Sequence, residues 1–137
     1  TVTKGGNVEH SSFTYNDRDE LIDEVFALNG TTQWTGEVEY DPQGNLTRSD
    51  RGETTIEYEY DIRNRLSSAT NTTSSVTTTA EYQYDHDGMQ VRRTETSGGT
   101  SATEFLIRDP LSPYGYSRVL EKRTPSGILL ASFIHGR

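Results

Sequence analysis

The sequence predicts an all-β protein, an array of antiparallel β-hairpins that together form a curved or spiralling sheet. Three observations predict this fold. A short phrase beginning with Tyr recurs four times, and its copies start 25, 20 and 24 residues apart. Polar and apolar residues alternate around the start of each copy, as in a half-buried strand. Each copy then continues with residue types that form tight turns.

Each copy of the phrase contributes a strand with one packing face. The copies occupy residues 15–21, 40–46, 60–66 and 84–91. Residues i and i+2 of a strand share a face, and the position two before each Tyr is aromatic or β-branched. The resulting two-residue stripes are Phe13/Tyr15, Val38/Tyr40, Tyr58/Tyr60 and Tyr82/Tyr84. These side chains are the predicted packing face of the sheet, and the residue between each pair is polar.

A tight turn follows each of these strands. The residue after the Tyr is a turn former whose side chain can bond the backbone two residues on: Asn16, Asp41, Asp61 or Asp85. The residue four after the Tyr is of a type that tolerates positive φ: Asp19, Gly44, Asn64 or Gly88. An apolar residue then resumes the pattern, so each unit reads as strand, tight turn and strand.

The whole chain, residues 1–137, is predicted to be a single repeat array. Residues 1–12 form an N-terminal strand or a flexible lead, and residues 13–107 hold the four repeat units. A loop and a terminal hairpin occupy residues 108–137, with Pro110 and Pro113 bracketing the loop.

Four shorter segments carry more local predictions. Residues 19–29 fit a helical stripe, but the register of the other repeats favours a strand there. Residues 71–79 are polar and of low complexity, which indicates a long hairpin tip or a sheet edge. Residues 97–100 predict a hairpin turn, and residues 125–127 predict the last turn of the chain.

The composition predicts a thin core and excludes several classes of partner. Only 30% of the residues are hydrophobic, whereas globular domains reach about 45–50% on a broader count that includes glycine. The eight Tyr residues add apolar area with a polar tip. A net charge of -8 argues against nucleic acid and anionic membrane surfaces. No apolar run is long enough for a membrane-spanning helix, and cysteine is absent.

The repeated phrase resembles the YD repeats of bacterial Rhs proteins and, more distantly, of teneurins. The resemblance covers roughly residues 13–136 and is clearest at residues 40–46 and 84–91. Asp19 and Asn64 depart from the usual Gly, and Asn16 departs from the usual Asp, but all three remain within turn chemistry. Residues 105–121 also resemble a segment found late in Rhs repeat arrays.

The resemblance implies a structural role outside the cell. Rhs repeats build the wall of a hollow shell that encloses a toxin, and such proteins are bacterial, secreted or held at the cell surface. They are also much longer than this chain, which begins at Thr1 without an initiator Met, so the expectation is a fragment or a processed product. An array of hairpins has two open edges, which predicts self-pairing into a homopolymer or continuation of a longer shell.

The positions of the polar residues predict a structural role in preference to a catalytic one. The repeat carboxylates occupy a recurring turn position, and no Ser-based nucleophile motif is present. His86 lies in the string Asp-His-Asp-Gly, which lacks the later ligands of a calcium loop. The sequence therefore predicts no catalytic residue, no metal site and no cofactor. An enzyme stays the least favoured of three hypotheses.

The second hypothesis is a surface adhesin that binds carbohydrate. Aromatic side chains on a polar strand face can stack on sugars, and Trp34 is the candidate glycan contact. The same aromatic residues at repeat positions are better explained as the packed face. The leading hypothesis is therefore a non-catalytic structural repeat protein, either a wall segment or a self-assembling subunit that can form filaments.

Overall fold

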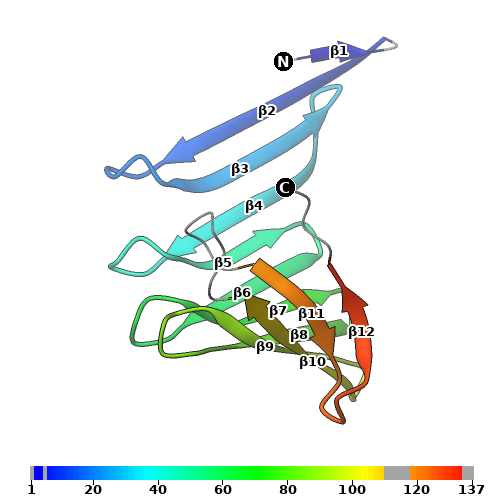
Figure 1. The fold of residues 1–137 in the computed structure, drawn as a ribbon. Coiled ribbons are helices and arrows are strands. Elements are labelled where there is room, and N and C mark those ends of the chain that lie inside the picture. The colour runs from blue at the N-terminus through cyan, green and yellow to red at the C-terminus, as the bar shows by residue number, and fades with distance from the viewer. Residues whose placement is uncertain (1, 5, 110–117, 134–137) are drawn as a thin grey trace. The chain divides into compact units, whose positions relative to one another are not determined.

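The computed structural model describes residues 2–4, 6–109 and 118–133, and within these ranges the chain forms twelve β-strands and no helix. Each strand is hydrogen-bonded to the next in chain order, from β1 to β12 (Figure 1). The strands are β1 (Val2–Lys4), β2 (Asn7–Tyr15), β3 (Leu21–Leu28), β4 (Thr31–Tyr40), β5 (Leu46–Arg51), β6 (Thr54–Tyr60), β7 (Leu66–Thr73), β8 (Val76–Tyr84), β9 (Gln90–Ser97), β10 (Thr100–Asp109), β11 (Arg118–Arg123) and β12 (Leu129–Ser132). The predicted all-β array of antiparallel hairpins is confirmed.

The chain divides into two compact units. The first holds residues 1–59 and 70–77, with β1 to β5, most of β6, and the end of β7 and start of β8 with the turn between them. The second holds residues 60–69 and 78–137, with the rest of β7 and β8 and the strands β9 to β12. The first two Tyr-Asp turns lie in the first unit, and the third and fourth lie in the second.

The segment 19–29 is a strand, as the repeat register predicts. β3 pairs with β2 on one side and with β4 on the other, and Asn29 and Gly30 form the next turn with φ values of 51° and 79°. Hydrogen bonds to two neighbouring strands outweigh the helical spacing of its apolar residues. Residues 2–4 and 7–12 also belong to strands, and β1 pairs with the start of β2.

The segment 71–79 differs from its prediction. It is neither a long tip nor a sheet edge, because β7 and β8 run through most of it and both lie inside the strand order. The tip itself is Ser74 and Ser75, and Ser74 has a φ of 56°. Threonine suits a strand, and the hydroxyls of Thr72 and Thr77 hydrogen-bond across the hairpin at 3.1 Å. β-Propensity therefore extended the strands into a stretch that composition alone marks as a loop.

The later turns lie where they are predicted. Residues 97–100 connect β9 to β10, with Gly98 and Gly99 at φ values of 56° and 78°. Residues 125–127 lie in the turn between β11 and β12, and the terminal hairpin is this pair of strands. Pro110 and Pro113 lie outside the described residues.

Very little of the described chain is buried. Val38 is the only buried hydrophobic side chain among the described residues, at 8% exposure. The stripe residues of the second, third and fourth repeats are buried or half-buried, but Phe13 and Tyr15 are 52% and 57% exposed. β1 pairs with β2 only as far as Glu9, so the later part of β2 has a described neighbour on one side only. The packing prediction therefore fails for the first stripe.

One face of the first unit carries an ion pair beside a glycine. In the register of β3, β4 and β5, Gly36 lies opposite Glu24 on one side and Arg51 on the other. Glu24 is buried at 6% exposure, and the Arg51 guanidinium pairs with its Oε1 across the glycine. Because Gly36 has no side chain, the two charged side chains can meet above it.

We expect Gly36→Ala to lower the free energy of unfolding by about 1–3 kcal/mol, the usual cost of overpacking. An added Cβ would lie 2.8 Å from Cγ of Glu24 and 2.9 Å from the backbone oxygen of Asp50, and a backbone atom cannot move aside cheaply. Urea unfolding followed by circular dichroism measures the change. The exposed neighbour Thr35→Ala is the control, expected within about 0.5 kcal/mol of wild type. Equal stability of both variants would contradict the role given to Gly36.

Candidate functional site

The candidate site is the series of Tyr-Asp turns, and the second turn shows its geometry. Oδ1 of Asp41 accepts hydrogen bonds from the backbone N–H groups of Gln43 and Asn45, each at 2.9 Å. Its Oδ2 accepts from the side-chain amide of Asn45 at 2.8 Å. The backbone closes twice, from Gly44 N to Asp41 O at 3.0 Å and from Asp41 N to Asn45 O at 2.9 Å. One carboxylate thus accepts three hydrogen bonds within the turn, and backbone oxygens accept the other two.

The other three turns repeat this geometry. Asn16, Asp61 and Asp85 each accept from the backbone N–H groups two and four residues ahead, at 2.8 to 3.0 Å. The residue three positions after this acceptor has positive φ in every copy. These residues are Asp19 (60°), Gly44 (87°), Asn64 (64°) and Gly88 (83°). The non-glycine members are Asp and Asn, the types that adopt this conformation at the lowest cost.

A fifth turn of the same kind closes the β11–β12 hairpin. Thr124 Oγ1 accepts from Ile128 N at 3.0 Å, and Gly127 N donates to Thr124 O at 2.9 Å. Gly127 has a φ of 84°. The sequence predicts a turn here, but it does not reveal that the turn has the geometry of the repeats. Thr replaces the usual Asp or Asn, and no Tyr precedes it. The spacing from Thr124 to the glycine is the signal that identifies it.

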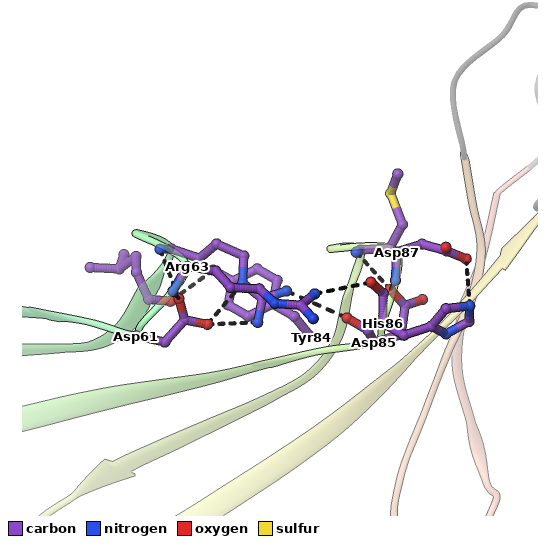
Figure 2. A network of polar contacts seen from close by, with 9 residues as sticks. Asp61, Arg63, Tyr84, Asp85, His86 and Asp87 are labelled. Carbon is purple, nitrogen blue, oxygen red and sulfur yellow. Dashed lines mark hydrogen bonds and ion pairs between the residues drawn. The ribbon is translucent and has the colours of Figure 1, made fainter.

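An arginine connects the third turn to the fourth, as Figure 2 shows. Nη1 of Arg63 donates to the backbone oxygen of His86 at 3.1 Å. Arg65, at the end of the same turn, forms an ion pair with Asp61 at 2.6 Å, and its Nη1 lies 3.4 Å from the backbone oxygen of Asp85. Two guanidinium groups of one turn therefore contact the backbone of the next.

The first and second turns are connected in the same way. Nη1 of Arg18 donates to the backbone oxygen of Pro42 at 3.3 Å. Arg18 and Arg63 occupy the same position of their turns, and each reaches the residue directly after the first Asp of the following turn. Sequence analysis did not single out either arginine, because a charged residue in an exposed turn reads as a solvated side chain.

Tyr84 is the most constrained of the repeat tyrosines. Its hydroxyl donates to the backbone oxygen of Leu66 at 2.7 Å, and the guanidinium of Arg65 lies 4.5 Å from its ring centroid. Burial raises the pKa of the Tyr84 hydroxyl above its ordinary value. Tyr58 and Tyr60 are half-buried on β6, and Tyr82 is half-buried on β8.

The carboxylates of the turns are engaged as hydrogen-bond acceptors. Hydrogen bonding from the Asn45 side chain lowers the pKa of Asp41 below its ordinary 3.8, and hydrogen bonding from Arg65 does the same for Asp61. His86 is exposed, with Nε2 3.2 Å from a carboxylate oxygen of Asp87. Over residues 2–4, 6–109 and 118–133, no three His, Cys, Asp or Glu side chains group closely enough to hold a metal ion.

Trp34, the candidate glycan contact, has a protein partner. Its ring stacks on Phe26 with centroids 5.9 Å apart and planes inclined by 26°, and the side chain is half-buried. One face of the indole is therefore used within the sheet. Glycan binding by Trp34 stays a prediction.

The strand order and the recurring turn define a structural β-hairpin repeat protein. A family model described as Teneurin YD-shell matches residues 4–102, and the chain belongs to this family. The family is one of structural, shell-forming β-repeat domains, which confirms the resemblance to YD repeats. The match covers the four Tyr-Asp turns and ends before the β11–β12 hairpin. No curated protein matches the chain. None of the described residues forms a helix that is long and apolar enough to cross a membrane.

We expect the chain to lose stability in acid through its turn aspartates. A carboxyl with a lowered pKa in the folded state stabilises the fold above its unfolded pKa, near 3.8, and this stabilisation is lost as the pH falls through the folded pKa. The double variant Asp41→Asn/Asp61→Asn should therefore show a shallower fall in unfolding free energy between neutral pH and pH values below 3.8.

Urea titrations across this pH range measure the slope. Asp17→Asn is the matched control, because Asp17 is an exposed residue of the first turn, where Asn16 and not Asp17 accepts from the backbone N–H groups. A double variant that retains the full acid dependence of the wild type would contradict the assignment.

Tyr84→Phe should lower the free energy of unfolding by about 1 kcal/mol, because it removes the hydrogen bond to Leu66 and leaves that carbonyl oxygen without its donor. Tyr82→Phe on the same strand is the control, since the Tyr82 hydroxyl has no partner among the described residues. Thermal and urea unfolding measure both variants. An equal effect of the two changes would show that the Tyr84 hydroxyl contributes nothing specific.

Proposed function

We propose that this chain is a non-catalytic structural protein of the cell exterior, a wall segment whose sheet is continued at its edges by further strands. The YD-shell family is typically extracellular or at the cell surface, which supports the location. The sheet order supports the role, since among the described strands the open edges are β12 at one end and, at the other, β1 with the part of β2 beyond Glu9.

The near absence of an apolar interior is the observation that carries the proposal. With Val38 as the only buried hydrophobic residue in the described part of the chain, stability depends on each hairpin lying against the next. Such an array gains stability from every additional hairpin, and it has no closed core that would limit its length. A wall is the structure that this arrangement favours.

The edge at β12 has the geometry needed for continuation. Phe133 N donates to Leu120 O at 2.8 Å, so alternate backbone groups of this strand point toward β11. The N–H and C=O groups of Ser132 then point away from β11, toward the open edge. Leu129 and Leu130 are 49% and 54% exposed beside it. An extended segment from a longer polypeptide, or a strand of a second copy, fits this edge.

The turn geometry supports a non-catalytic role. Asp41 and Asp61 hold their carboxylates against the backbone and side chains of their own turns, with lowered pKa values. A general base needs a free carboxylate at a substrate and a pKa near the working pH. The repeat aspartates are therefore turn formers in this proposal.

Strand addition at β12 predicts assembly that depends on protein concentration. Light scattering after size-exclusion chromatography and electron microscopy of the purified chain should show polymers that grow with concentration. Ser132→Pro should abolish them, because proline removes the outward N–H without a hydrogen bond to β11. The melting temperature of this variant should remain that of the wild type.

Two matched variants control the experiment. Ala131→Pro removes an inward N–H and should lower the melting temperature, whereas Ser132→Thr keeps the edge and should assemble like the wild type. Discrete monomers of the wild type at every concentration would contradict self-assembly. Polymers of undiminished length in Ser132→Pro would contradict the use of the β12 edge.

A further inference from the structure

The second unit has a hollow on one face of its sheet, and the proposed role as a wall segment does not explain it. It has a volume of about 390 Å³, within the range of about 300–1,000 Å³ that is usual for small-molecule sites. Arg93 and Glu95 of β9 line it, with Ala102 and Glu104 opposite them on β10. Because these residues alternate along their strands, they all belong to the same face of the sheet.

A β-bulge in the last strand brings an apolar side chain to this hollow. Lys122 pairs with Ala131 and Arg123 pairs with Leu129, which leaves Leu130 as the extra residue of β12. A bulge redirects the side chain at the irregular position, and Leu130 is one of the lining residues. Its side chain is 54% exposed. Together with Ala102, Leu130 gives the hollow an apolar patch that no described residue covers.

The charges around the hollow cancel in pairs. The Arg93 guanidinium lies 2.6 Å from a carboxylate oxygen of Glu95, and the ammonium of Lys122 lies 3.0 Å and 3.1 Å from the two oxygens of Glu104. A charged ligand would find no uncompensated opposite charge here. Each paired carboxylate still has lone pairs that can accept from a neutral hydroxyl.

We propose that this hollow binds a neutral carbohydrate. A sugar ring offers a C–H face to Ala102 and Leu130 and hydroxyl groups to the carboxylates of Glu95 and Glu104. The Thr100 hydroxyl lines the hollow and makes no hydrogen bond to any described residue, so it is available to a sugar hydroxyl as donor and acceptor. This site differs from the candidate at Trp34, which belongs to the first unit.

Titration calorimetry of the 137-residue chain against a panel of neutral oligosaccharides, sialylated oligosaccharides, and acidic and basic peptides tests the proposal. We expect saturable binding of at least one neutral oligosaccharide. Ala102→Leu fills the apolar patch without a change of charge and should weaken this binding by about tenfold or more. Thr100→Val should weaken it by about fivefold, the equivalent of one hydrogen bond.

Matched variants away from the hollow complete the design. Ala27→Leu on β3 and Thr31→Val on β4 should bind like the wild type, and circular dichroism reports whether each variant is folded. Thr100→Val retains the volume of the side chain, so it tests the site even if Ala102→Leu does not fold. The proposal is overturned if no neutral oligosaccharide saturates, if a peptide binds in its place, or if both hollow variants retain full affinity.

Discussion

One side-chain oxygen that accepts the two backbone N–H groups ahead of it is the interaction on which this structure depends. Asp41 and Asp61 provide it as carboxylates and Asn16 as an amide, whereas the Thr124 hydroxyl accepts only one such bond, from Ile128 N. The bond closes each turn locally and places a positive-φ residue at a set position, which fixes the register of the two flanking strands. A sheet with one buried hydrophobic side chain among its described residues needs its register specified in this way, because hydrophobic burial specifies it only weakly.

The turns also contact one another, which extends local order into the array. Arg18 and Arg63 each donate to a backbone oxygen of the following turn, within the first and second units respectively. These contacts join hairpins at their ends, while the strand ladder joins them along their length. A hairpin array of this kind is held together by backbone hydrogen bonds and short polar contacts, which leaves the faces of the sheet for other uses. We propose one such use for the hollow beside Leu130.

The hairpin repeat and its turn positions are readable from the sequence because they arise from interactions between residues close in the chain. Asp19 and Asn64 adopt positive φ as their types suggest, although they replace the glycine of other copies. The exposure of Tyr15 is not readable, because it depends on how far the short β1 extends along β2. The arginine contacts between turns and the bulge at Leu130 are also hidden, since both depend on register and distance between strands.

The strands follow one another in the sheet in the same order as in the chain, and this affects how the protein folds during synthesis. Every strand finds its partner in the segment synthesised just before it, so no strand has to wait for a distant part of the chain. Contacts between segments that are close in sequence lower the entropic cost of folding and speed it. A chain that emerges from a ribosome from its N-terminus can therefore add one finished hairpin after another. Growth in one direction, in which each new strand pairs as soon as its hairpin forms, limits the exposure of unpaired strands to neighbouring molecules.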